Sequence, residues 1–393
     1  MPSIPGPPII ESVAFGELAI FPRQAEAPIK EALDFLTDTM ISHNGKEDRI
    51  QLRSKPRQSF VYKIPVQAWD MAAFFNVGYG AIRQKWAVPL WTEAQYIGSV
   101  ASGIQHVVCN TGLYDFRDNS LALLFTGCGD YQLVEITMVE PDRINIVAGV
   151  RKMTEAWLAP VRLGWIAGNI TRETSGYNAK YSIAYEIEDN PELEPIEPPQ
   201  FDGHDIYFEP GLLSGGKLSR TIEKQLDVAD FDLGPVAYRS PWLNSRHATP
   251  YRTILEGPAE IHAHKQWLFR RMGKFRAFWM PTFEHNLNIR NTGNIVATLL
   301  IDSDFYMAYG QGRKHIAIET LDGVWHARTV SNALQMNDET VQLTLAAPLN
   351  IQSNNIARAS YLGLHRLDAD KIELQWIGGG VVESNVRILE ISP

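Results

Sequence analysis

The sequence predicts a mainly β fold with a few helices, duplicated in tandem, and three observations support this prediction. Most segments are short, alternate apolar with polar residues, and are rich in Val, Ile, Thr and aromatic residues. Turn-forming pairs such as Asn44-Gly45 and Asp322-Gly323 separate these segments. Similar patterns recur in the same order on both sides of an acidic, proline-rich stretch at the midpoint. We therefore expect a β-sandwich or barrel with a flanking helix in each half.

The predicted domain boundary is residues 186–202, where Glu and Pro predominate. Such a sequence forms neither a helix nor a central strand, so it predicts a linker. The first β domain is then residues 1–185, and the second is residues 203–393. A chain of 393 residues has room for two or three domains of ordinary size, which agrees with this division.

Four short patterns relate the two halves. In chain order, Ile29, Leu33 and Asp34 correspond to Ile222, Leu226 and Asp227, residues 56–57 to residues 250–252, residues 86–91 to residues 278–283, and residues 132–136 to residues 314–318. The spacing between counterparts changes only by loop-sized amounts. We interpret this order as a tandem duplication of one domain.

Each half contains one predicted amphipathic helix. In the first half, Pro65 suits the first turn of a helix, and Val66, Trp69, Ala73 and Val77 fall on one stripe, which predicts a helix over about residues 65–77.

In the second half, Pro258 begins a similar pattern in which Ile261, Leu268 and Met272 share a face, and Gly273 can end the helix. This predicts a helix over about residues 258–272. The clearest strands are expected at residues 121–125, 131–138, 296–301, 341–345 and 386–391.

Composition excludes several classes of function. Hydrophobic residues make up 45% of the chain and charged residues 21%, so the chain should fold. A net charge of −9 gives no overall attraction to DNA phosphates or anionic lipid, which argues against sequence-specific DNA binding. No window approaches the roughly 20 apolar residues that span a bilayer, and the first residues lack the basic region of a signal peptide. We expect no stable membrane insertion and assembly in a cytoplasm-like compartment.

The nearest approach to a catalytic motif is residues 211–218, in which the glycines and Lys217 have the spacing of a phosphate-binding loop. Leu218 stands where such a loop needs a hydroxyl group to hold magnesium, and Pro210 precedes the motif in place of a buried parallel strand. We therefore expect an ordinary loop. The enzymatic alternative is a nucleotide hydrolase that depends on Lys217.

Other candidate ligands give no site. His262 and His264 lie two residues apart on the predicted helix, so their side chains point about 200° apart and cannot share a metal ion; we expect surface histidines. Cys109 and Cys128 are too few for a disulfide framework or a metal cluster, and we expect buried, reduced thiols. The sequence contains no HExxH, GxSxG or paired CxxC motif. The prediction is therefore no enzyme, with no catalytic, cofactor-binding or metal-binding residues.

Aromatic residues surround the prolines that recur in both halves: Trp86, Trp91, Phe278, Trp279 and Phe283. If enclosed, each would bury on the order of 200 Å² and fasten the helix to the sheet. The alternative is an aromatic patch for a partner subunit. The basic residues between Arg270 and Arg276 are interpreted as a solvated helix end or as a docking surface for an acidic neighbour.

A further set of patterns lies in residues 29–38, 44–49, 52–53, 56–57, 86–95 and 267–281. In these segments the chain resembles tail-tip structural proteins of long-tailed bacteriophages with flexible tails. The resemblance implies a tail-tube-like fold, assembled into rings at the distal end of the virion tail after synthesis in the host bacterial cytoplasm. Such families have no catalytic residues to carry over.

The resemblance also suggests why the chain is duplicated. A tail tube has sixfold rings, whereas a central spike or fibre is commonly threefold, and a trimer of two-domain chains offers six related domains. We therefore expect a baseplate hub that is a trimer of this chain and joins the tail tube or distal tail ring to the spike or fibre. An acidic lumen would let the genome pass without sticking.

Two alternatives remain open at this point. One is a hexameric distal tail protein, and the other is a carbohydrate-binding tail module that stacks sugars on exposed Trp and Tyr.

Overall fold

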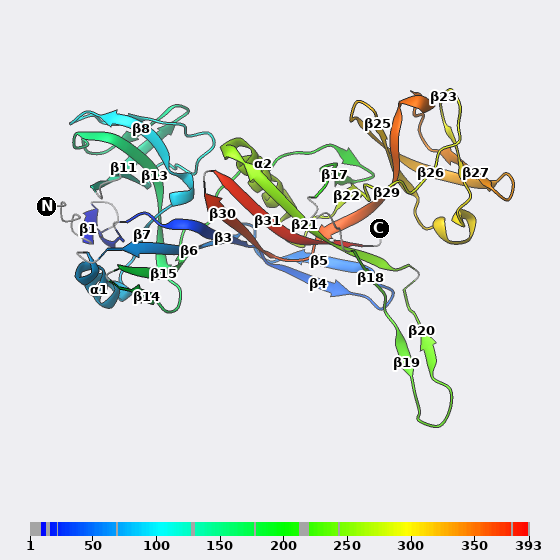
Figure 1. Cartoon of the computed structure of the whole chain (residues 1–393), viewed down its shortest axis with the longest axis horizontal. Helices are drawn as coiled ribbons and strands as arrows, with labels where there is room; N and C mark the ends of the chain where they lie inside the picture. Colours follow the sequence, from blue (N-terminus) through cyan, green and yellow to red (C-terminus); the bar gives the residue numbers. More distant parts are fainter. Residues whose placement is uncertain are drawn as a thin grey trace.

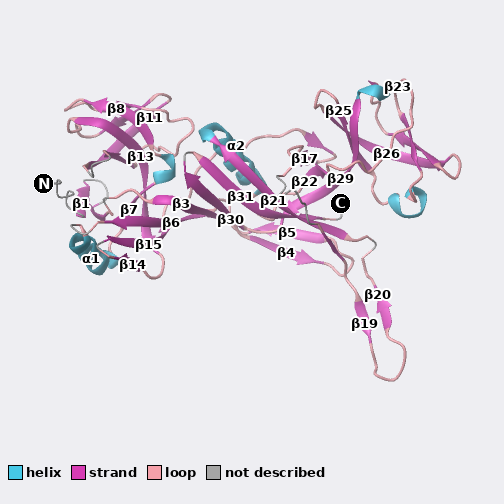
Figure 2. Ribbon diagram, viewed as in Figure 1, coloured by secondary structure: helices cyan, strands magenta, loops and turns pink. Residues whose placement is uncertain are grey.

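The computed structural model describes residues 9–12, 16–21, 23–67, 70–126, 130–176, 178–211, 220–242, 244–378 and 380–391. Strands dominate this part of the chain, which confirms the mainly β prediction (Figures 1 and 2). The two α-helices that follow corresponding strands in the two halves are α1 (Met71–Gly80) and α2 (Gly257–Arg271).

The strands fall into two consecutive sets. Those of the first half are β1 (Ile9–Ser12), β2 (Gly16–Ala19), β3 (Glu26–Asp34), β4 (Thr37–Ile41), β5 (Glu47–Gln51), β6 (Arg57–Val66), β7 (Trp86–Pro89), β8 (Gln95–Val100), β9 (His106–Val108), β10 (Leu121–Phe125), β11 (Tyr131–Glu140), β12 (Arg143–Ile146), β13 (Met153–Ile166), β14 (Thr171–Ser175) and β15 (Asn178–Ile187). Those of the second half are β16 (Gln200–Phe201), β17 (His204–Ile206), β18 (Thr221–Glu223), β19 (Asp227–Ala229), β20 (Ala237–Arg239), β21 (Arg246–Glu256), β22 (Phe278–Pro281), β23 (Asn294–Ile295), β24 (Thr298–Asp302), β25 (His315–Thr320), β26 (Trp325–Gln335), β27 (Thr340–Leu345), β28 (Ile351–Gln352), β29 (Ile356–Leu367), β30 (Lys371–Gly378) and β31 (Val381–Glu390). Short turns of helix are η1 (Ala81–Arg83), η2 (Trp91–Glu93), η3 (Tyr306–Gly310) and η4 (Ser353–Asn355).

The main sheet of each half has the same order of pairings. In the first half β2 runs parallel to β7, β7 pairs with β13, β13 with β15, β15 with β6, and β6 with β3. In the second half β17 runs parallel to β22, β22 pairs with β29, β29 with β31, β31 with β21, and β21 with β18. α1 and α2 occupy the same place, between the counterparts β6 and β7 or β21 and β22. The halves therefore share one connectivity.

The correspondence extends to the remaining strands. The hairpin β4–β5 lies between β3 and β6, and the hairpin β19–β20 lies between β18 and β21. The strands β9 to β12 form a small sheet beside β13, and β24 to β27 form one beside β29. Each small sheet encloses its own apolar core, one around Ile144 and one around Leu343.

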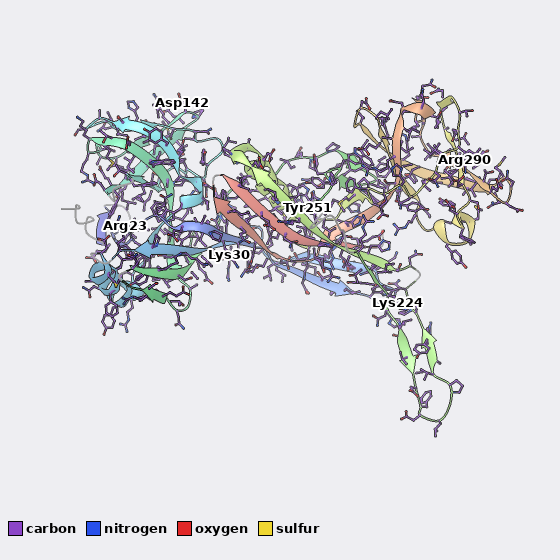
Figure 3. All side chains as sticks on the ribbon, in the orientation of Figure 1. Arg23, Lys30, Asp142, Lys224, Tyr251 and Arg290 are labelled. Atoms are coloured by element: carbon purple, nitrogen blue, oxygen red, sulfur yellow. The ribbon has the colours of Figure 1, made fainter. Side chains whose placement is uncertain are left out.

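The strand registers refine the four sequence correspondences. Pro89 lies opposite Val161, and Pro281 lies opposite Leu362, so these two prolines are true counterparts. The strand pairings that continue from these prolines make Tyr62 the counterpart of Tyr251, and both side chains are buried. The sequence match between residues 56–57 and residues 250–252 is therefore wrong in register. Tyr251 is labelled in Figure 3.

The other two matches shift as well. The pairings relate Leu33 to Ile222, a shift of four residues from the sequence match. They relate β25 to β10, so the match with residues 132–136 of β11 is wrong by one strand.

The two helices differ from their predicted ranges to different degrees. α2 begins one residue before the predicted start, and Met272 ends it in the left-handed conformation with φ of 54°. α1 begins later than predicted, because Pro65 and Val66 pair with β15 as the end of β6. Of the proposed stripe, Val77 is buried and Trp69 lies outside the described residues.

The two halves join directly. β3 of the first half pairs antiparallel with β30 of the second, from Ile29 opposite Trp376 to Asp34 opposite Lys371. One apolar core continues through both halves, and in it Phe35 meets Phe269 edge to face at 6.0 Å. The predicted linker contains no strand between residues 188 and 199, whereas Glu186 and Ile187 belong to β15.

Candidate functional site

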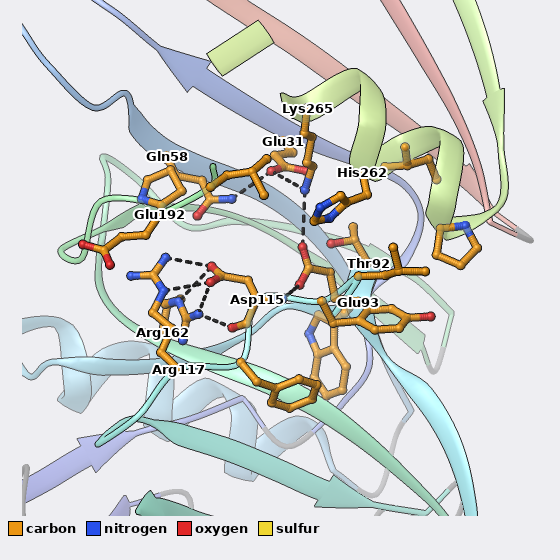
Figure 4. Close-up of a pocket in the computed structure, with 18 of the residues that line it drawn as sticks. Glu31, Gln58, Thr92, Glu93, Asp115, Arg117, Arg162, Glu192, His262 and Lys265 are labelled. Carbon is orange, nitrogen blue, oxygen red and sulfur yellow. Dashed lines mark hydrogen bonds and ion pairs between the residues drawn. The ribbon is translucent and has the colours of Figure 1, made fainter. Parts of the chain in front are cut away.

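A cavity of about 1500 Å³ lies where the two halves meet (Figure 4). The first half contributes Glu31 from β3, Glu93 from η2 and Asp115 from the loop before β10, and the second half contributes His262 and Lys265 from α2. The residues that line it therefore come from segments far apart in the sequence, which the β3–β30 pairing brings together.

Lys265 links α2 to the first half. Its Nζ lies 3.0 Å from Oε1 of Glu31 and 3.3 Å from Oε1 of Glu93. Burial alone would lower the pKa of Lys265, but the two carboxylates raise it above its ordinary value. Burial raises the pKa of Glu93, although Lys265 opposes this. Lys265 therefore stays charged and compensates two carboxylates that have little contact with water.

Glu31 has further partners from both halves. Its carboxylate accepts hydrogen bonds from Nε2 of Gln58 at 2.8 Å and from Nε1 of Trp376 at 3.0 Å. Because Trp376 belongs to β30, Glu31 holds the junction through a side chain as well as through the strand pairing.

A second ion cluster lines the same cavity and is drawn below Glu31 in Figure 4. Asp115 accepts from Nε of Arg117 at 2.7 Å, and its carboxylate lies 2.6 Å from Nη2 of Arg162. Burial by itself would raise the pKa of Asp115, but the two guanidinium groups hold it below its ordinary value. The backbone N–H of Asp115 donates to Oε2 of Glu93 at 2.7 Å, which connects the two clusters. All three carboxylates thus accept from cations or from N–H donors, an arrangement that positions segments of the chain.

The hairpin β4–β5 fastens the junction at a second place. Glu47 lies between Nη1 of Arg246 at 3.0 Å and Nε of Arg366 at 2.7 Å. All three side chains are almost fully buried. Burial by itself would raise the pKa of Glu47, but the hydrogen bond and charge of Arg366, together with Arg246, lower it. The first half therefore places one carboxylate between two arginines of the second half.

The structure places His262 and His264 in different surroundings. His262 lines the junction cavity and is half-buried. The prediction of a surface residue is wrong for His264, which is buried and stacked on Trp267 at 5.7 Å, because α2 turns this face to the core. Burial lowers the pKa of His264 to about 4. The two side chains share no site.

The cysteine and lysine candidates are only partly described. Cys109 is buried, as predicted, and burial raises the pKa of its thiol to about 12. Cys128, Lys217 and Leu218 lie outside the described residues. In the part of the chain that the structure describes, no group of three or more His, Cys, Asp or Glu is arranged to hold a metal ion.

The aromatic residues beside the repeated prolines belong to the core. Trp86, Trp91, Phe278 and Trp279 are buried, so the alternative of an exposed aromatic patch is wrong for these four. In the second half, Trp267 of α2 meets Phe278 of β22 edge to face at 5.6 Å. This contact fastens the helix to the sheet, as expected.

The basic cluster at the end of α2 has an acidic partner within the chain. Arg270 donates from Nε to Oδ2 of Asp205 at 2.9 Å, and the fully buried Arg271 also binds this carboxylate. A solvated helix end is therefore wrong for Arg271, because β17 brings Asp205 against the helix.

Sequence reasoning missed the residues that join the halves. Glu31, Glu47, Lys265 and Arg366 have no local motif, since their partners are distant in the chain. The recurring sequence patterns indicate that two similar halves exist, but they carry no signal for the residues that join them.

No protein-family model matches the sequence, and none of the curated proteins matches it. Within the described residues, no helix is long and apolar enough to cross a membrane.

Proposed function

We propose that this chain is a structural protein of a bacteriophage tail tip, a baseplate hub whose copies surround the tail axis as a trimer. In this role it joins the tail tube or distal tail ring to the central spike or fibre. The proposal includes the origin of the chain by tandem duplication and makes no use of catalysis.

The observation that supports the proposal is the shared connectivity of the two halves, from the parallel pair β2–β7 or β17–β22 to the pair β6–β15 or β21–β31. A closed ring requires that contact surfaces recur by rotation around one axis. A chain with two halves of one connectivity offers related surfaces twice, so three copies supply six related units.

The contacts of the junction suit a permanent structural part. The halves are joined by a strand pair, a common apolar core and two buried ion clusters. Fixed orientation between the halves is what a ring needs, because a mobile joint would allow open assemblies as easily as closed ones.

The test is the presence of the chain in virions and the effect of its loss. Mass spectrometry of purified phage particles should find the chain in the tail fraction. Deletion of its gene should yield filled heads without complete tails. Particles that lack the chain and retain infectivity would refute the proposal.

A further inference from the structure

The junction within one chain brings together two different surfaces. The first half contributes β3 and the hairpin β4–β5. The second half contributes β30, α2 and the arginine pair that encloses Glu47. The halves share their connectivity. The second half therefore has counterparts of β3 and β4–β5, and the first half has counterparts of β30 and α2.

In the second half, the counterparts of β3 and β4–β5 pair with no strand of the first half within the described residues. Within the described residues, β18 pairs only with β21, and the hairpin β19–β20 extends away from the body of the molecule (Figure 1). At its base, Oδ2 of Asp227 lies 3.4 Å from Nε2 of His43 in the β4–β5 turn, and Figure 3 shows the far end of the hairpin standing clear of other elements. Phe231 and Leu233 at its tip are 81% and 93% exposed. Apolar residues this exposed mark an interaction surface when they gather on one projecting element.

In the first half, the counterparts of β30 and α2 are open. β14 is the counterpart of β30, since each precedes the strand that pairs with β6 or β21. Among the described strands β14 pairs only with β15, and all five of its residues are exposed. α1, the counterpart of α2, exposes Phe75 and Tyr79. An unpaired strand edge beside exposed aromatic side chains is able to receive another strand.

The two arginines that hold Glu47 also have counterparts. The strand registers relate Arg246 to Arg57, and Arg366 to Trp165, which is 42% exposed. Of the two arginine positions that hold Glu47 in the second half, one is also an arginine in the first half, and the other is an exposed tryptophan there.

The hairpins differ in a matching way. The β4–β5 hairpin inserts the carboxylate of Glu47, whereas the tip of β19–β20 presents Phe231 and Leu233 alternating with Asp230 and Asp232. An apolar tip suits Trp165, and its two carboxylates suit Arg57. Compared with the junction within one chain, the hairpin tip and the surface proposed to receive it are both more apolar, and they remain complementary to each other.

We propose that β18 and the hairpin β19–β20 of one copy dock on the first half of a second copy, along β14, α1, Arg57 and Trp165. The occupant is a second copy of this chain, and the contact repeats the junction found within each chain. Its place in a ring rests on the proposed function. The contact joins two different surfaces, so each copy has one of each and the chain can continue to a third copy.

The test uses full-length chains that have lost one surface each. One variant carries Phe231→Asp and Leu233→Asp, and the other carries Trp165→Ser. Sedimentation velocity should show that each variant associates with itself at least about 30-fold more weakly than the unaltered chain, the loss of one central contact. A mixture of the two variants should form a one-to-one dimer, because each retains the surface that the other lacks. Tyr309→Asp, at an equally exposed aromatic residue of η3, is the control and should associate normally.

Three results would overturn the docking proposal: an unaltered chain that stays monomeric up to about 1 mM, variants that associate as the unaltered chain does, or a mixture that forms no dimer. Circular dichroism of each variant separates lost docking from lost folding, and these exposed positions should leave the fold intact. Loss of docking alone would leave the tail-tip proposal standing, since that depends on the presence of the chain in virions.

Discussion

Replacement of Lys265 by methionine tests the idea that buried ion pairs hold the two halves together. Methionine keeps most of the length and apolar contact of the side chain but removes the charge between Glu31 and Glu93. The Lys265 side chain is 12% exposed and that of Glu31 is fully buried, so water compensates little of the loss.

The size of the effect follows from what each carboxylate keeps. Breaking a buried pair by removing one partner costs about 3–5 kcal/mol. Glu31 keeps Gln58 and Trp376 as donors, and Glu93 keeps the backbone N–H of Asp115. We therefore expect a loss of about 3 kcal/mol, the lower end of that range.

Urea denaturation at pH 7, followed by tryptophan fluorescence, measures this loss. The stability difference between Lys265→Met and the unaltered chain should shrink as the pH falls toward 5. The pKa of Glu93 is already raised by burial, and it rises further when Lys265 is removed. The Glu93 carboxyl of the variant therefore binds a proton, and its buried negative charge disappears. Adding Glu93→Gln to the variant should restore at least half of the loss. Lys30→Met, at an exposed position of β3, is the control and should change stability by less than about 0.5 kcal/mol. A loss below about 1 kcal/mol for Lys265→Met is the value of an exposed ion pair, and it would show that the Lys265 pairs do not hold the two halves together.

Three further predictions concern single residues. Glu47→Gln should lower stability by about 3 kcal/mol in the same assay, because Arg246 stays buried without a counter-charge and Arg366 keeps only Asp368; an unchanged urea midpoint would contradict this. His264 has a pKa of about 4 in the folded chain. Between about pH 6.5 and 4 the unfolded chain therefore binds a proton at this residue that the folded chain does not bind. Stability should fall by about 3 kcal/mol as the pH drops across that range. His264→Phe should remove this contribution and leave that of the buried His365, whose pKa is also about 4, whereas the exposed His285→Gln should leave the acid limb unchanged. In a Cys128→Ser variant, Cys109 should react with a maleimide at pH 8 only as fast as the chain unfolds, because its thiol is buried and has a pKa of about 12. Rapid labelling of the folded protein would contradict the buried position of Cys109.

The strand pattern and one helix could be predicted because their signals are local. β10 occupies residues 121–125 as expected, and α2 differs from its predicted range by one residue at each end. Alternation and an amphipathic stripe with a proline start need no knowledge of distant segments. The same local reasoning placed Pro65 in a helix, where its partner in β15, Lys180, instead keeps it in a strand.

The junction could not be predicted because its residues have no local signal. Glu47 looks like an ordinary turn-proximal acid, and its arginine partners lie 199 and 319 positions away. His264 is buried by the packing of α2, and Asp205 reaches Arg270 from a strand 65 positions earlier. Only the pairings of distant strands decide these contacts, so the repeat suggested that two halves exist but not how they meet.

The proposed tail-tip role is best tested by symmetry-resolved electron microscopy of the phage particle that we propose contains this chain, counting its copies around the tail axis. We predict three copies, with the first and second halves alternating around the ring. Six copies would instead favour a distal tail ring and contradict the hub, and a particle without this chain at the tail tip would contradict the proposed function altogether.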